Sequence, residues 1–216
     1  MRYLLSGLIL LFLLLSCETQ QQDPKILVFS KTEGFRHESI EAGVEAIKIL
    51  GQENGFGVDH SEDAGIITEG DLQQYEAIVF LNTTGDIFNE EQQYEFQRYY
   101  QAGGGFVGIH AAADTEYDWP WYGKLVGGYF NGHPNNPNVR NADLQVKVAG
   151  HESCQHLPEV WNRDDEWYNY KNLHPNMEVL INLDESTYEG GTNGDSHPIA
   201  WKRDRMFYTG LGHTIE

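Results

Sequence analysis

Apolar residues in the first half of the chain are grouped in short continuous runs, separated by longer segments of mixed polarity. Each run has the length of a strand and lacks the alternation of a half-exposed one, which is typical of strands buried on both faces of a parallel sheet. The three clearest runs span residues 25–30, 77–81 and 106–109, and a weaker one spans residues 57–60.

The segments between these runs have helical patterns. The apolar residues at positions 40, 44, 47 and 50 recur at spacings of three and four, which predicts a helix over residues 38–54. Asn89 and Gln92 form a capping-box pattern, which indicates a helix from there to Tyr100. A short acidic helix is expected over residues 69–75. Strands that alternate with helices predict an α/β fold with a doubly wound, mostly parallel sheet and helices on both faces.

Beyond His110 the alternation weakens. One irregular helix is expected over residues 119–130, and further strands are expected at residues 143–148, 177–183, 198–202 and 206–209. The last of these strands lies close to the end of the sequence, with no further element to cover it. We therefore expect one domain over residues 25–216, truncated at its C-terminal end.

The N-terminal segment has the pattern of an export signal. Arg2 precedes an apolar stretch over residues 4–15, which is shorter than the roughly 20 residues of a transmembrane helix. The stretch ends in Leu-Leu-Ser-Cys17, which resembles a bacterial lipobox. This predicts a signal peptide over residues 1–16, lipidation of Cys17 and a tether over residues 17–24, so that the protein is anchored to a membrane on the periplasmic or cell-surface side. The alternative is a soluble secreted protein with an incidental cysteine.

The net charge of the chain argues against one class of partner. The 216 residues include 14 Lys and Arg against 33 Asp and Glu, a formal net charge of −19, and this excess argues against a nucleic-acid partner because phosphates are bound by cationic side chains. Two cysteines are too few for a disulfide scaffold.

Polar residues follow the three clearest strands, in segments 31–39, 82–89 and 110–122. In an open α/β sheet, ligands bind outside the carboxyl ends of the strands, so these loops are expected to share one crevice. They contribute Glu33, Arg36, His37, Asn82, Thr83, Thr84, Asp86, His110, Asp114, Glu116 and Asp118.

His110 lies at the strand-to-helix corner of this crevice. The chain has no Gly-x-Ser-x-Gly elbow, and small residues flank His110 at the corresponding position instead. An imidazole held there suits proton transfer near neutral pH or metal ligation. The alternative is a histidine that only makes a backbone hydrogen bond.

Aromatic residues crowd the same regions, after His110 and around Glu166. Flat amphipathic rings beside carboxylates and amides suit a sugar, because its C–H faces stack on rings and its hydroxyls need donors and acceptors. Ordinary core packing is the alternative for each ring taken singly.

Several motifs together resemble the ThuA-like (trehalose utilisation) domain family. They are Phe35-Arg36-His37, GGFVGIHAA at 104–112, Trp121-Tyr122, GGYFNGHP at 127–134, DEWY at 165–168, HPIAW at 197–201 and YTGLGHT at 208–214. The resemblance implies a flavodoxin-like fold of the class I glutamine amidotransferase kind, with His110 where those enzymes have a cysteine, and hence no amidotransferase chemistry. It also implies a role in carbohydrate utilisation, with a sugar dehydrogenase that makes 3-keto sugars as a possible partner in the pathway.

These observations lead to one main hypothesis and two alternatives. The main hypothesis is acid/base chemistry on a carbohydrate or keto-sugar; the alternatives are a non-catalytic carbohydrate-binding lipoprotein and a histidine-based site for a divalent metal, with no cofactor otherwise expected. The candidate catalytic residues are His110, His133, His213, Glu166 and Asp114. The candidate substrate-binding residues are His37, Arg36, Thr84, Trp121, Tyr122, Tyr168 and His197.

Overall fold

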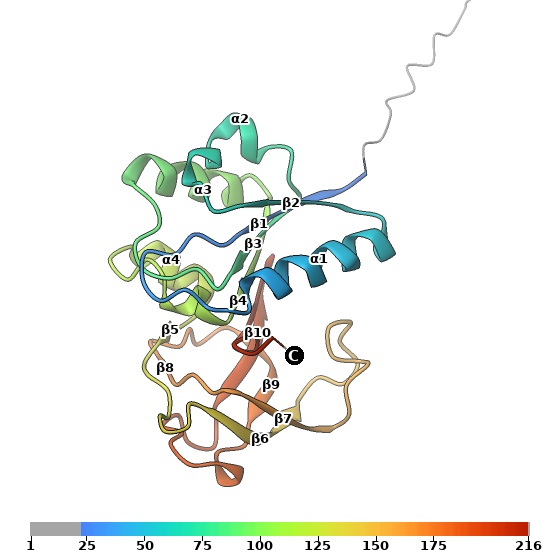
Figure 1. Cartoon of the computed structure of the whole chain (residues 1–216), viewed down its shortest axis with the longest axis vertical. Coiled ribbons are helices and arrows are strands. Elements are labelled where there is room, and N and C mark those ends of the chain that lie inside the picture. Colours follow the sequence, from blue (N-terminus) through green and yellow to red (C-terminus); the bar gives the residue numbers. More distant parts are fainter. Residues whose placement is uncertain (1–22, 216) are drawn as a thin grey trace, which may run out of the picture.

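The computed structural model describes residues 23–215, which form a nine-stranded sheet and a separate two-stranded ribbon (Figure 1). The strand order in the large sheet is β2-β1-β3-β4-β11-β10-β9-β6-β7. The predicted leader, the lipidation residue Cys17 and most of the tether lie outside the described residues.

Five adjacent strands of the large sheet are parallel. They are β2 (Gly57–Ser61), β1 (Lys25–Phe29), β3 (Ala77–Leu81), β4 (Gly105–Ile109) and β11 (Met206–Thr209). Because parallel strands end at the same edge of a sheet, the loops that follow β1, β3, β4 and β11 meet there.

The remaining strands extend the sheet in antiparallel fashion. They are β10 (Pro198–Arg203), β9 (Glu178–Leu183), β6 (Val139–Val146) and the edge strand β7 (Val160–Glu166). A short ribbon pairs β5 (Tyr129–Phe130) with β8 (Tyr170–Lys171).

Helices cover both faces of the parallel half (Figure 1). The helix α1 (Ile40–Asn54) packs on one face over a small apolar core that includes Val28, Val44 and Val79. The other face carries α2 (Glu69–Leu72), α3 (Glu90–Gln101) and α4 (Pro120–Val126) over a larger, aromatic-rich core. Three short 3-10 turns complete the elements: η1 (Ala64–Ile66), η2 (His110–Asp114) and η3 (Glu185–Thr187).

The predicted α/β fold class is confirmed, and so is the capping box, in which Asn89 and Gln92 bond reciprocally at the start of α3. The second half differs from expectation in detail. The strand predicted from residue 143 begins at Val139, and β7 was missed because its sequence is mostly polar and charged. Charged side chains on an edge strand discourage pairing with other chains, so an apolar pattern is not required there. None of the helices in residues 23–215 is long and apolar enough to cross a membrane.

Candidate functional site

His110 lies at a sharp turn directly after β4. Its φ is 48°, which is uncommon for a residue with a Cβ and is a form of strain that accumulates at functional sites. Two contacts hold the turn: the Tyr208 hydroxyl donates to the His110 carbonyl (2.7 Å), and the Ala111 N–H donates to the side-chain oxygen of Asn82 (3.3 Å). The turn directs the imidazole towards the carboxyl edge of the sheet.

The ring of His110 is held in one orientation. Its Nδ1 lies 2.7 Å from the carbonyl oxygen of Gly210, and since a carbonyl only accepts, Nδ1 carries a proton. The Tyr168 ring packs against it with 4.0 Å between ring centroids. The other nitrogen, Nε2, is buried without a hydrogen-bond partner and lies 3.4 Å from Oε2 of Glu166. When the ring is neutral, its lone pair therefore faces a carboxylate.

Glu166 is the last residue of β7, and the strand end also anchors the loop after β11. Asn138 Nδ2 donates to Oε1 of Glu166 (2.7 Å). The adjacent Asp165, which is fully buried, accepts the backbone N–H groups of Gly212 (3.0 Å) and His213 (3.2 Å). These bonds place Nδ1 of His213 3.1 Å from Oε2 of Glu166.

His37 comes from the loop after β1, which is fastened to the same place. The Ser39 hydroxyl donates to the carbonyl of Gly212 (2.8 Å), and Asn82 Nδ2 donates to the same carbonyl (3.2 Å). The Thr84 hydroxyl donates to a backbone carbonyl of the His37 loop (3.0 Å). As a result His37 is only 3% exposed.

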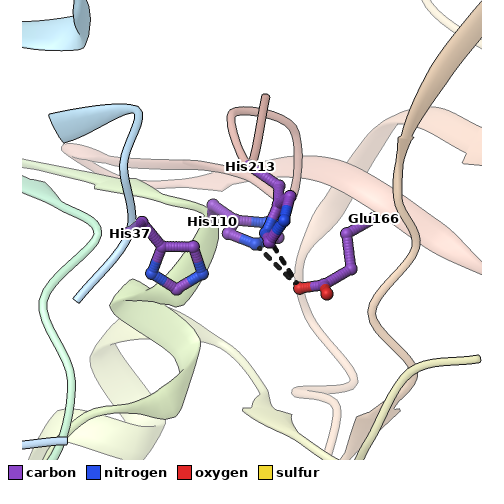
Figure 2. Close-up of side chains that lie close together, drawn as sticks. All are labelled: His37, His110, Glu166 and His213. Atoms are coloured by element: carbon purple, nitrogen blue, oxygen red, sulfur yellow. Dashed lines mark ion pairs between the residues drawn. The ribbon is translucent and has the colours of Figure 1, made fainter. Parts of the chain in front are cut away.

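Three imidazoles and one carboxylate thus lie close together (Figure 2). Ring centroids are 5.0 Å apart for His37 and His110, 5.1 Å for His37 and His213, and 5.4 Å for His110 and His213. One candidate ligand atom from each histidine and from Glu166 lies within 4.8 Å of the others. In Figure 2 the carboxylate points towards His110 and His213, and His37 lies on the other side of these rings.

The charges of this cluster are coupled. Burial, reinforced by the neighbouring His110 and His213, lowers the pKa of His37 to about 3. Burial alone would raise the pKa of Glu166, but the adjacent imidazoles and the Asn138 amide outweigh it and hold this pKa well below its usual range. The Glu166 carboxylate in turn raises the pKa of His213. A carboxylate with these neighbours remains ionised in the folded protein.

The cluster borders a cavity of about 330 Å³. Phe35, Phe130 and Tyr168 form an aromatic part of its wall, and Asp114 and His133 lie among the polar residues. Burial raises the pKa of Asp114, while a hydrogen bond from the Tyr117 hydroxyl (2.6 Å) opposes the rise. Pockets of roughly 300–1,000 Å³ that combine apolar walls with a few polar groups are typical small-molecule sites. A larger hollow of about 700 Å³, between α2 and α3, is lined by no histidine of the described part of the chain.

The structure brings most of the candidate residues together at this cavity. Nδ1 of His133 lies 3.4 Å from Oε1 of Glu166 and 2.8 Å from the carbonyl oxygen of Pro134. The predicted residues in the cavity wall or in the cluster behind it are His37, His110, Asp114, His133, Glu166, Tyr168 and His213.

Other candidates lie elsewhere. Tyr122 is fully buried, and its hydroxyl donates to the Ala112 carbonyl; Trp121 packs against the core and stacks on Trp119. Neither lines the cavity. These rings belong to the core, which is the alternative that the sequence left open.

Three more candidates support the structure near the cavity. Arg36 pairs at the surface with Glu41 (2.6 Å) and Glu62 (2.9 Å). Thr84 is buried and holds the His37 loop. His197 is fully buried between Oε1 of Glu185 (2.7 Å) and the carbonyl of Tyr168 (2.8 Å), so it positions the backbone of a cavity residue.

Asn138, Asp165 and Gly210 also belong to the site, although none of them was among the predicted site residues. Asp165 stands next to Glu166 in the same motif, which was a usable signal. Gly210 lies in the same motif as His213, which was a weaker signal of the same kind. Asn138 had no such signal, because it acts through a contact with a residue distant in sequence.

The strand order and the position of the cavity define a flavodoxin-like α/β protein with a histidine- and carboxylate-lined site at the carboxyl edge of its parallel strands. A model of the ThuA family, described as trehalose utilisation, matches residues 25–216. The chain therefore belongs to the ThuA family, and the resemblance found in the sequence is confirmed.

Solved structures agree. The chain is similar to a ThuA-like protein from Bacteroides uniformis ATCC 8492, with 27% identity, a TM-score of 0.76, and coverage of 89% of this chain and 83% of that one. It is also similar to a ThuA-like protein from Parabacteroides merdae ATCC 43184, with 22% identity, a TM-score of 0.70, and coverage of 89% and 81%. The second likeness shows the fold alone. No curated protein matches this chain.

Proposed function

We propose that this chain is an exported, lipid-anchored member of the ThuA family that binds a sugar or keto-sugar in the 330 Å³ cavity and moves a proton at a carbon next to a carbonyl group. The observation that carries the proposal is the composition of the cavity wall. Aromatic rings stand on it together with a carboxylate and histidines.

Recognition of the sugar falls to the rings. The ring of Phe130, which packs on the buried Tyr168 ring with 4.2 Å between ring centroids, offers an apolar surface for the C–H face of a sugar. Phe35, which is 65% exposed, adds a second apolar ring at the same cavity. The small volume favours a single sugar ring over a whole disaccharide.

Proton transfer needs one base and one group that stabilises the developing oxyanion. Asp114 is the base: its carboxylate takes the proton from the carbon next to the carbonyl, and the bond electrons move to the carbonyl oxygen to give an enediolate. The histidine cluster next to it polarises that oxygen, and return of the proton regenerates a carbonyl compound. No net oxidation occurs, and no glutamine chemistry is expected with His110 at the elbow.

The test is exchange of substrate protons with solvent. The full chain is incubated in D₂O with a 3-keto-glucoside, and loss of the proton next to the carbonyl is followed by NMR. We expect exchange with the wild type, at least about 100-fold slower exchange with Asp114→Asn, and unchanged exchange with Asp118→Asn, because Asp118 is exposed and lies outside the cavity wall.

Binding without exchange in the wild type would overturn the proton transfer and identify a carbohydrate-binding protein. Absence of both binding and exchange for simple sugars and keto-sugars would overturn the whole proposal.

A further inference from the structure

The geometry points to a site for one transition-metal ion of the zinc class, held by His37, His110, His213 and Glu166. Binding of the ion does not depend on the sugar chemistry proposed above. Three lines of observation lead to it: unpartnered ring nitrogens, ligand-like spacing and outer hydrogen bonds.

Each histidine of the cluster has one buried ring nitrogen without a hydrogen-bond partner: Nδ1 of His37, Nε2 of His110 and Nδ1 of His213. Leaving a buried polar atom unpartnered costs about 1–3 kcal/mol, and most such atoms in folded proteins are paired. Two of them, Nε2 of His110 and Nδ1 of His213, face the Glu166 carboxylate, and one partner that accepts lone pairs would satisfy both. A metal cation is such a partner. His37 offers a further ring nitrogen within 4.8 Å of the other candidate ligand atoms.

The spacing of the donor atoms fits this explanation. Oε2 of Glu166 lies 3.4 Å from Nε2 of His110 and 3.1 Å from Nδ1 of His213, yet neither nitrogen makes a hydrogen bond. With metal–ligand bonds of about 2.0–2.1 Å, neighbouring ligand atoms of a tetrahedral site are roughly 3.3 Å apart. These two separations are close to those of ligands that share an ion, and the candidate ligand atoms of all four residues lie within 4.8 Å of one another.

The outer contacts are also those of a metal site. A metal-bound histidine usually donates its other N–H to a carbonyl or carboxylate, which fixes the ring. His110 Nδ1 makes this bond with the carbonyl of Gly210 (2.7 Å). An outer hydrogen bond also fixes the carboxylate. Asn138 donates to Oε1 of Glu166 (2.7 Å), whereas Oε2 is the oxygen that faces His110 and His213.

The donor set selects the ion. Three imidazoles and one carboxylate suit Zn²⁺, Co²⁺, Ni²⁺ or Fe²⁺, whereas Mg²⁺ and Ca²⁺ prefer oxygen ligands. Because His37, Glu166 and His213 also line the cavity, the ion is accessible to a ligand there. With four protein ligands in place, the ion would polarise a carbonyl oxygen by taking it as a fifth ligand, which is the electrophilic role left to the cluster under the proposed function.

The test measures metal binding without sugar. The full chain in detergent is stripped with a chelator, dialysed and titrated with Zn²⁺, Co²⁺, Mg²⁺ and Ca²⁺ by calorimetry, and the visible bands of bound Co²⁺ are recorded. We expect one equivalent of Zn²⁺ or Co²⁺ per chain, with Mg²⁺ and Ca²⁺ at least about 100-fold weaker. His110→Ala and Glu166→Gln should each lower the affinity for Zn²⁺ by at least about 100-fold, since loss of outer partners alone costs 10–100-fold.

The exposed His156 provides a matched control, and His156→Ala should bind as the wild type does. Circular dichroism checks the folding of each variant; Glu166→Gln preserves the shape of the side chain and decides the test if His110→Ala does not fold. No binding by the wild type, or binding that persists in Glu166→Gln, overturns the metal site. Stoichiometric binding without proton exchange overturns only the proposed sugar chemistry.

Discussion

Nε2 of His110 and Oε2 of Glu166 lie 3.4 Å apart, although the two residues come from opposite halves of the sheet. His110 follows the parallel strand β4, and Glu166 ends the antiparallel edge strand β7. The loop after β11 joins the two halves: its Gly210 carbonyl holds the ring of His110, and its backbone N–H groups are held by Asp165. The site therefore depends on the exact course of one loop.

Gly210→Ala tests this dependence. An added Cβ at Gly210 would lie 2.1 Å from the Tyr170 hydroxyl oxygen and 2.7 Å from Cδ1 of Ile199, so the loop must shift. We expect a loss of about 1–3 kcal/mol in the free energy of unfolding, together with weaker Zn²⁺ binding, measured by denaturant titration and calorimetry. Gly150→Ala is the control, because no heavy atom lies within 4 Å of the added Cβ there. Equal effects of the two substitutions would contradict the role of the loop.

Tyr117→Phe should shift the pH dependence of proton exchange. The Tyr117 hydroxyl donates to the charged form of Asp114, so it lowers a pKa that burial has raised. Without this hydrogen bond the pKa of Asp114 rises further. The pH below which kcat/KM falls, because the base is protonated, therefore moves to a higher value. The readout is the kcat/KM profile for the keto-glucoside.

Tyr94→Phe removes a hydroxyl from an exposed tyrosine of α3 and should leave that profile unchanged. An acidic limb that stays in place in Tyr117→Phe, or that moves to lower pH, would exclude Asp114 as the base.

His197→Ala should affect stability rather than metal stoichiometry. The ring is fully buried between Glu185 and the carbonyl of Tyr168, and its removal leaves a cavity and a carboxylate without its imidazole partner. We expect a loss of about 3 kcal/mol in the free energy of unfolding, by denaturant titration at neutral pH. One equivalent of Zn²⁺ should still bind to the folded variant.

The comparison for this variant is His174→Ala, which removes a local contact with the Asn176 N–H and should cost less than about 1 kcal/mol. Loss of Zn²⁺ binding by folded His197→Ala would instead assign His197 to the metal site.

Cys17→Ala should release the protein from the membrane. If Cys17 is acylated after removal of residues 1–16, its loss leaves no attachment point for a lipid. The measurement is partition between membrane and soluble fractions, with incorporation of labelled palmitate in cells of a bacterium that processes lipoproteins. Cys154→Ala, at a buried cysteine of the core, should still incorporate the label. Label incorporated by Cys17→Ala would rule out the predicted anchor.

Local patterns of apolar residues in the sequence predicted much of the fold. The apolar runs of β1, β3 and β4 and the spacing of apolar residues in α1 are consequences of burial, which acts on each segment wherever it lies in the sequence. The order of the antiparallel strands was not predictable in this way. The polar strand β7 is recognisable as a strand only through its pairing with β6.

The candidate site, like the fold, was predictable from the sequence only in part. Because parallel strands end at a common edge, His37 and His110 were expected in one crevice from sequence alone. The sequence also showed which residues were chemically capable, including Glu166, His133 and His213. It could not show that Trp121 and Tyr122 belong to the core, since an aromatic ring has the same sequence signature in a core as in a ligand site.

The sequence by itself determined the α/β class, the family and the crevice at the strand ends, because these depend on short-range hydrophobic patterns and motifs. Only the tertiary structure decided that three imidazoles and the Glu166 carboxylate lie together. Gly210 holds the ring of His110, Asn138 holds the Glu166 carboxylate, and Asp165 holds the backbone at His213. The physical reason is that donor separations near 3 Å are set by hydrogen bonds between segments distant in sequence, and such bonds leave no periodic pattern along the chain.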